Sequence, residues 1–278
     1  MRDFRFGVNL LGTGYDFLER VRAADAAGVD VLMVPDHLGI IAPFPALTAA
    51  GQVTSRMRLG NFVLNAGFYS PALLARDCAT TDRLTGGRLE IGLGAGYVAD
   101  EFEAAGLEFP SAGKRVRHLA ATVEYLRTSL ADEAYSPAPI QSPPPIMVAG
   151  VGDKVLTLAA EHADIVALAS VPDEDTLADR VAFLRSAAGD RFDELELNLI
   201  VFAFAVDRDP DFEGLRRFQP DATDEQLRAS MNTLCGTFDE VVAKVKRLRA
   251  DHGVSYFTVI EPDAAALEDL SRVIAAVR

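Results

Sequence analysis

The chain has 278 residues, of which 49% are hydrophobic and 24% charged, and its mean hydropathy is +0.13. These values are typical of a soluble globular protein and exclude a disordered or disulfide-framed chain. The formal net charge of -14 disfavours binding to nucleic acid, and no basic stripe with interleaved aromatic residues offsets it.

Strand and helix patterns alternate along almost the whole chain. Apolar, β-branched runs predict strands at residues 4–10, 29–34, 57–65, 88–94, 146–149, 164–169, 196–206 and 256–261. Helical spacing of apolar residues predicts helices at 15–27, 45–55, 71–84, 114–130, 153–162, 173–187, 238–250 and 264–277. Gly28 is expected to cap the first helix, and Pro71 to open the third.

This alternation gives eight strand-helix units, and the strands read as buried on both faces. We therefore expect an α/β fold, a closed (β/α)8 TIM barrel that forms one domain over residues 1–278, rather than an open doubly wound sheet. Residues 207–234 are longer than a simple connection and rich in Asp, Arg and Pro, so we expect an insertion after the seventh strand.

Targeting and metal-binding features are absent from the sequence. No uninterrupted apolar run approaches the ~20 residues that cross a bilayer, and residues 1–5 lack the pattern of a signal peptide. We expect a cytoplasmic protein that is not bound to a membrane. Cys78 and Cys235 lack ligand-like spacing and are expected to be buried thiols, so no metal site is predicted.

In a barrel of this kind the ligand site lies at the carboxyl ends of the strands. Asp36 and His37 follow the second strand there, where a histidine can exchange protons near neutral pH. Adjacent residues in an extended segment point apart, so the acid need not touch the ring. A capped turn with a satisfied histidine stays open as an alternative.

Glycines end the fourth strand. Gly92, Gly94 and Gly96 permit close approach of the backbone to a ligand, and Tyr97, Asp100 and Glu101 follow as groups able to exchange protons. Glycine at a strand end also serves a tight turn, and that reading stays open. The pattern departs from a dinucleotide-binding loop because the final spaced glycine is missing.

A second candidate site joins the fifth strand to its helix. Gly150, Val151, Gly152, Asp153 and Lys154 could bind an anion such as phosphate, through N–H groups of the first helical turn and the lysine. An ordinary turn with Asp153 as N-cap is the alternative. The sequence holds no Gly-x-Ser-x-Gly, His-Glu-x-x-His, Walker lysine or Cys-x-x-Cys motif, which leaves hydrolase and metal chemistry without support.

Four segments together resemble the luciferase-like monooxygenase superfamily, especially its coenzyme F420-dependent oxidoreductases. They are AGVDVLMVPDH at 27–37, RLGNFVLN at 58–65, LTGGRLEIGLGAG at 84–96 and PPIMVAGVGDK at 144–154. The resemblance implies a deazaflavin across the carboxyl mouth of the barrel, with its phosphate near residues 150–154, and a non-prolyl cis peptide at Phe62-Val63. It implies His37 and Asp36 as catalytic residues, and Tyr97 is a third candidate because its hydroxyl could donate a proton. The cofactor-binding residues that it implies are Asp36, Phe62, Val63, Asn65, Gly94, Ala95, Gly96, Tyr97, Val98, Gly150, Val151, Gly152, Asp153 and Lys154.

The expected function is hydride transfer between F420 and a small organic substrate, most simply reduction of an imine or activated alkene, with His37 or Tyr97 handling the proton. Two alternatives stay open: a flavin mononucleotide (FMN)-dependent monooxygenase and a non-catalytic cofactor-binding protein. The sugar-phosphate dehydrogenases of the superfamily have an acid where Tyr97 stands and a tryptophan after the histidine. This chain has no tryptophan, so glucose-6-phosphate oxidation is not expected. The superfamily often forms homodimers, so a homodimer is one possibility here, and the oligomeric state stays open.

Overall fold

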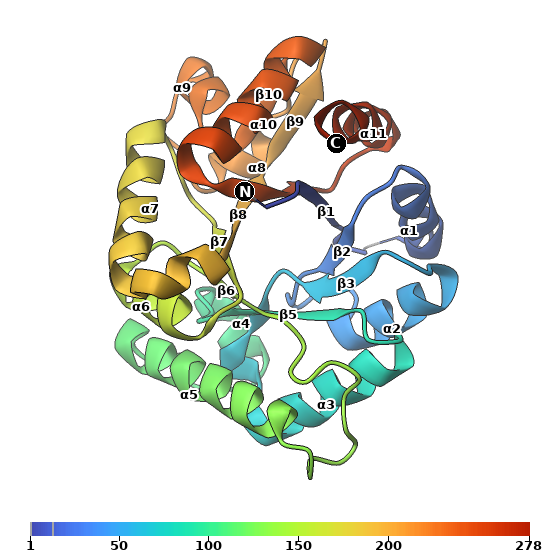
Figure 1. The fold of residues 1–278 in the computed structure, drawn as a ribbon, viewed down its shortest axis with the longest axis vertical. Helices are drawn as coiled ribbons and strands as arrows, with labels where there is room; N and C mark the ends of the chain where they lie inside the picture. The colour runs from blue at the N-terminus through green and yellow to red at the C-terminus, as the bar shows by residue number, and fades with distance from the viewer. Residues whose placement is uncertain (1, 13) are drawn as a thin grey trace.

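The computed structural model describes residues 2–12 and 14–278, and its parallel strands close into a barrel inside a ring of helices (Figure 1). The strand order is β3-β2-β1-β11-β8-β7-β6-β5-β4, and an additional pairing of β3 with β5 closes the sheet. The strands are β1 (Arg5–Asn9), β2 (Val31–Val34), β3 (Arg58–Asn61), β4 (Leu64–Asn65), β5 (Leu89–Gly94), β6 (Ile146–Ala149), β7 (Ile165–Leu168), β8 (Glu196–Val201) and β11 (Val254–Ile260). Since β3 and β4 are successive pieces of one barrel strand, the barrel has the eight strands that were predicted.

Each of these eight barrel strands is followed by a helix that packs on the outside of the barrel (Figure 1). The eight outer helices are α1 (Phe17–Ala26), α2 (Pro43–Val53), α3 (Pro71–Leu84), α5 (Ala112–Ala131), α6 (Asp153–His162), α7 (Glu174–Ala188), α10 (Phe238–His252) and α11 (Ala264–Val277). In α5, the buried face consists of Leu119, Val123, Leu126 and Leu130, at the spacing of one helical face. None of the helices in the described ranges is long and apolar enough to cross a membrane.

Short elements that the sequence did not predict lie in the connections. They are η1 (Ala66–Phe68), α4 (Ala99–Ala104), η2 (Gly189–Glu194), α8 (Glu213–Arg216) and α9 (Asp224–Ala229). The helix α4 buries a single large side chain, Phe102, against Phe68 and Phe109, at ring-centroid distances of 5.2 Å in each case. Tertiary contact therefore holds this six-residue helix, which is too short to announce itself by periodicity.

The single strand predicted at 196–206 is wrong, because the chain leaves the barrel at Phe202. Beyond β8, strand β9 (Ala203–Val206) pairs in parallel with β10 (Thr233–Gly236) in a separate two-stranded sheet. The side chain of Asn232 helps to hold the exit, since its Nδ2 donates to Ile200 O at 2.8 Å. The insertion between these strands has its own small core of Ala203, Phe212, Leu215 and Leu227.

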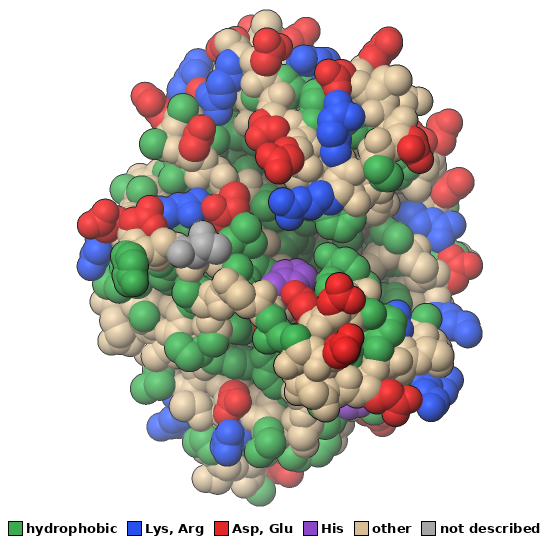
Figure 2. Space-filling model, turned by 180° about the vertical axis from the view of Figure 1, so that it is seen from behind, with side chains coloured by type: hydrophobic (Ala, Val, Ile, Leu, Met, Phe, Trp, Pro, Cys, Tyr) green, Lys and Arg blue, Asp and Glu red, His purple; other side chains and the backbone are tan. Residues whose placement is uncertain are grey.

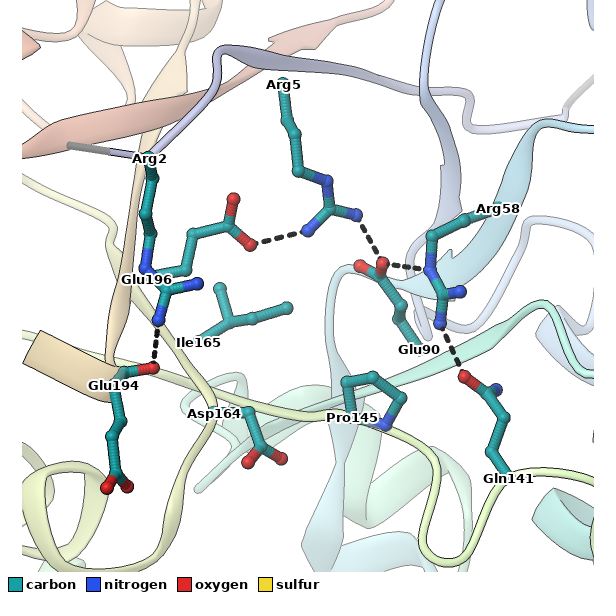
Figure 3. Close-up of a pocket in the computed structure, with 10 residues that line it drawn as sticks. All are labelled: Arg2, Arg5, Arg58, Glu90, Gln141, Pro145, Asp164, Ile165, Glu194 and Glu196. Carbon is teal, nitrogen blue, oxygen red and sulfur yellow. Dashed lines mark hydrogen bonds and ion pairs between the residues drawn. The ribbon is translucent and has the colours of Figure 1, made fainter. Parts of the chain in front are cut away.

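An ion network fills the amino-terminal end of the barrel (Figure 3). Arg5 lies between Glu90 and Glu196 and pairs with both, and Glu90 also accepts from Arg58 Nε at 2.5 Å. Glu90 and Glu196 are almost fully buried. Burial raises the pKa of Glu196 above its ordinary value, although Arg5 acts in the opposite direction. These charges therefore neutralise one another inside the barrel, beside a recess of ≈ 280 Å³.

Candidate active site

The opposite, carboxyl end of the barrel carries the predicted site residues. Figure 2 shows this face from the side opposite to Figure 1, with histidine atoms in a hollow near its centre. Acidic side chains lie beside the histidine, and basic side chains lie on the other rim of the hollow (Figure 2). The loops that follow β2, β4, β5, β6 and β8 all end at this face.

His37 is paired with Glu101, a residue that the sequence did not single out as its partner. The Nδ1 atom of His37 lies 2.9 Å from Oε1 of Glu101, which stands on α4. The histidine side chain is 38% exposed, whereas that of Glu101 is only 17% exposed. With Glu101 ionised, Nδ1 donates the hydrogen bond, so Nε2 is left to accept or give a proton. A proton-exchanging group with a fixed tautomer thus stands at the barrel mouth.

Asp36 has other partners than its neighbour His37. Its Oδ2 accepts a hydrogen bond from the backbone N–H of Asn65 at 3.1 Å. Burial raises the pKa of Asp36, while the Asn65 N–H and the Tyr69 hydroxyl favour its charged form. Asp36 therefore ties the end of β2 to the end of β4, and it is Glu101 that orients His37.

The glycines of β5 allow close approach, but to neighbouring protein atoms. A Cβ on Gly92 would lie 1.9 Å from Asn61 O, and one on Gly94 would lie 2.8 Å from a methyl group of Val63. Gly96 has φ +73°, and its Cβ would lie 2.2 Å from Asn65 Oδ1. These glycines leave room for the interrupted barrel strand β3–β4 beside β5.

The basic residue Arg115 supports the same turn from outside. Its Nε donates to Gly96 O at 2.9 Å, and its guanidinium lies 4.2 Å from the centre of the Phe109 ring. Ala95 and Gly96 are half-buried, and Val98 is the N-cap residue of α4. The glycine-rich strand end is thus locked against α5 and leads directly to Glu101.

An apolar floor lies at the centre of the mouth. The peptide between Phe62 and Val63 is cis, at the position that the sequence resemblance implied. Four partly exposed residues at strand ends pack on the barrel interior, namely Val63, Ala149, Phe202 and Ile260. A flat, largely apolar ring system would cover these side chains and remove their surface from water.

The segment 150–154 forms an open helix N-terminus. Gly152 is the N-cap residue of α6 and no side chain caps this end, so the alternative of Asp153 as N-cap is not what the structure has. Asp153 instead pairs with Arg180 at 2.6 Å. The side chain of Lys154 is exposed, and it forms no ion pair among the residues described. Free N–H groups, the positive helix end and Lys154 suit an anionic group.

Tyr97 stands edge-on to His37, with ring centroids 6.4 Å apart and an interplanar angle of 82°. Its side chain is 65% exposed. Partial burial of the hydroxyl and the nearby Glu101 raise its pKa, and Arg217 lowers it in part. The hydroxyl therefore keeps its proton at neutral pH. Over residues 2–12 and 14–278, no group of three or more His, Cys, Asp or Glu side chains could hold a metal ion.

Relatives of this sequence include both F420- and flavin-dependent proteins. An uncharacterized protein of Mycobacterium tuberculosis is 29% identical over 244 residues, which cover 74% of this chain and 81% of the relative. An F420-dependent glucose-6-phosphate dehydrogenase of Kribbella flavida is 32% identical over 44% of this chain and 39% of its own length. The oxygenase component of a flavin-dependent trigonelline monooxygenase of Acinetobacter baylyi is 31% identical over 48% of this chain and 42% of its own length.

A solved structure shares the whole fold. The coenzyme F420-dependent tetrahydromethanopterin reductase of Methanopyrus kandleri superposes with a TM-score of 0.80 at 19% identity, over 100% of both chains. At the level of sequence, the family model for luciferase-like monooxygenase matches residues 12–219. The chain therefore belongs to the luciferase-like monooxygenase family.

Proposed function

We propose that this protein is an F420-dependent oxidoreductase that transfers a hydride between the deazaflavin and a small organic substrate. The favoured reaction is reduction of an imine or an activated alkene. The observation that carries the proposal is the His37–Glu101 pair, 2.9 Å apart, beside the apolar floor of the barrel mouth. Reduction by hydride also requires a proton, and this pair can deliver one to a substrate held in the hollow.

The residues of the mouth fit the cofactor in two respects. The partly exposed side chains of Val63, Ala149, Phe202 and Ile260 offer an apolar surface for a flat ring. The uncapped N-terminus of α6, with Lys154 beside it, offers a site for a phosphate group. When bound, the deazaflavin supplies or accepts the hydride, and the protein orients it and excludes water.

The protein's own residues would then divide the work at the mouth. Glu101 is a positioning residue that keeps Nδ1 of His37 protonated and leaves Nε2 for proton exchange. Tyr97 is a second proton donor, because its raised pKa keeps the hydroxyl neutral, but for the same reason it is the weaker acid. Asp36, tied to Asn65, holds together the strand ends that would bind the cofactor.

An FMN-dependent monooxygenase is the second candidate, favoured by the similarity to the trigonelline monooxygenase component. A reduced flavin reacts readily with oxygen, whereas a deazaflavin has carbon in place of the reactive ring nitrogen and reacts poorly with oxygen. The cytoplasmic location expected from the sequence stays a prediction.

Fluorescence titration of the purified protein with F420 and, separately, with FMN tests the proposal. We expect saturable binding of F420 and much weaker binding of FMN, followed by turnover of reduced F420 with a panel of cyclic imines and activated alkenes. Tight binding of FMN without binding of F420 would overturn the proposal in favour of the monooxygenase. Binding of F420 without turnover on the whole panel would favour a non-catalytic cofactor-binding protein.

A further inference from the structure

The insertion places one arginine above the barrel mouth. Arg217 directly follows α8, and the next residue, Phe218, packs its ring against Phe202 with centroids 4.8 Å apart. Phe202 belongs to the apolar floor, so this contact ties the end of α8 to the mouth. The buried Phe212 and Leu215 hold the rest of the segment in the core of the insertion. The position of Arg217 is therefore set by packing on both sides of it.

The guanidinium of Arg217 has no partner within residues 2–12 and 14–278, unlike those of two other arginines of the insertion. Arg216 pairs with Asp224, and Arg228 contacts Asp209 at 3.4 Å. Among the residues that the structure describes, the Arg217 side chain forms neither an ion pair nor a hydrogen bond, and it is exposed. It lies close enough to Tyr97 to oppose the rise in the pKa of that hydroxyl.

Large apolar side chains are exposed on the segments that follow the strands at this end of the barrel. Tyr97, Leu38 and Phe218 are 65%, 48% and 44% exposed, respectively, although leucine and phenylalanine are usually buried. A ligand that satisfied both features would carry an anionic group and an apolar body. The net charge of -14 makes a local cation necessary for such a ligand, because the protein as a whole repels anions.

We infer that Arg217 is a specificity-determining residue that binds the carboxylate or phosphate of an organic anion, whose apolar body reaches toward His37. The inference rests on the proposed function, since it names the substrate class of that site: an amphiphilic acid, such as an unsaturated carboxylate. A guanidinium suits this task because its planar fork can donate two parallel hydrogen bonds to a carboxylate or phosphate.

Calorimetric titration with matched acid and amide pairs tests the inference. The probes are crotonate with crotonamide and cinnamate with cinnamamide, which differ in charge but share the activated alkene. We expect the wild-type protein to prefer the acid in at least one pair, and Arg217→Gln to weaken binding of that acid about tenfold while leaving the amide unchanged. Added salt should reduce the preference in the wild type.

Arg216→Gln is the matched control. It removes the same charge one residue away from Arg217, but the Arg216 side chain is already paired with Asp224. It should leave the preference for the acid intact, and Arg217→Lys should retain part of it. The inference is overturned if the wild type prefers no acid, or if Arg217→Gln does not change the preference. Weakened binding of F420 in Arg217→Gln, with the acid unaffected, would also overturn it and assign the arginine to the acidic tail of the cofactor.

The titrations are run both without cofactor and with F420 at saturation. Loss of the preference for the acid without loss of F420 binding concerns Arg217 alone. Failure of the wild type to bind F420 concerns the proposed function, whatever the acid and amide pairs show.

Discussion

The two ends of the barrel use charged residues in opposite ways. At the amino-terminal end, Arg5 lies between Glu90 and Glu196, and each buried charge is held by another (Figure 3). At the carboxyl end, the His37 side chain of the His37–Glu101 pair is 38% exposed, and Lys154 and Arg217 are exposed without ion pairs among the residues described. The charges at the first end are paired with one another, whereas several at the second end are exposed and unpaired among the residues described.

This difference indicates which charges serve stability and which serve function. Burying ions costs free energy that their mutual attraction roughly offsets. The network at the amino-terminal end therefore affects stability most when one partner is removed. Exposed charges at the carboxyl end contribute little to stability and can be changed with little effect on folding. Substitutions at the two ends should therefore separate unfolding free energy from activity, and the following predictions run from the largest expected effect to the smallest.

Arg5→Met should cause the largest loss of stability. It keeps much of the side-chain volume but leaves Glu196 buried without its partner, and Glu90 with Arg58 alone. We expect the free energy of unfolding, measured by urea titration, to fall by about 3–5 kcal/mol. Arg2→Met is the control, because Arg2 is exposed and donates only to backbone carbonyls. Equal losses in the two variants would contradict a special role for the network.

His37→Ala should have the largest effect on activity. We expect turnover with F420 to fall about 10²–10⁴-fold, because the proton-exchanging group is lost. Cofactor affinity should change less than about threefold, since the floor and the α6 N-terminus are untouched. Glu101→Gln should have a smaller effect, because the amide oxygen can still accept from Nδ1.

His162→Ala serves as the control for the same type of substitution, because His162 is exposed at the end of α6. It should leave turnover unchanged. An equal loss of turnover and cofactor affinity in His37→Ala would give His37 a structural role only.

Gly96→Ala should destabilise the strand end that leads to Glu101. The new Cβ would lie 2.2 Å from Asn65 Oδ1, an atom that accepts a hydrogen bond from Gly67 N at 3.0 Å. We expect a loss of about 2–4 kcal/mol in unfolding free energy from strain and lost contacts. Gly86→Ala is a matched control, since Gly86 has a similar φ of +69° but nothing within 4 Å of its Cβ. A loss no larger than that of Gly86→Ala would show that Asn65 adjusts freely.

The smallest expected effect is a change in the pH dependence of stability. Burial raises the pKa of Glu196, so the folded protein binds this proton more tightly than the unfolded chain. Its contribution to stability is full below the ordinary pKa of 4.5 and is lost as the pH rises through the raised value. Glu196→Gln should remove this decline from the plot of unfolding free energy against pH.

Glu194→Gln should leave that plot unchanged in slope, because the Glu194 side chain is 70% exposed. Parallel curves for wild type and Glu196→Gln would refute the prediction.

The barrel could be predicted from the sequence because each of its strands has a recognisable local pattern. Runs such as Val31–Val34 are apolar and β-branched, and a helix of matching period follows each one. The break at Phe202 could not be seen in the same way, because residues 199–206 are apolar without interruption on both sides of it. Two distant contacts end β8. Asn232, which lies 32 residues beyond Ile200 in the sequence, donates a hydrogen bond to the Ile200 carbonyl, and β9 pairs with β10 instead of continuing the barrel strand.

The site was predictable in its position and less so in its pairing. The resemblance implied His37 at the mouth and a cis peptide at Phe62-Val63, and the latter is confirmed. The partner of His37 lies 64 residues away, on a helix too short to be predicted. Glu101 did carry a sequence signal, as an acid directly after the glycine-rich strand end. Arg217 carried none, because its place above the mouth depends on the packing of Phe218 on Phe202.

The separate pairing of β9 with β10 has a consequence for how this protein could change over time. The segment that bears Arg217 lies between two strands that pair outside the barrel sheet, and it has its own small core. Replacement of residues on α8 would change the ligand specificity of the barrel mouth, while the barrel strands and the His37–Glu101 pair stay unchanged. Selection for a new ligand could therefore act on this module alone, and a laboratory library confined to residues 207–232 would explore the same freedom.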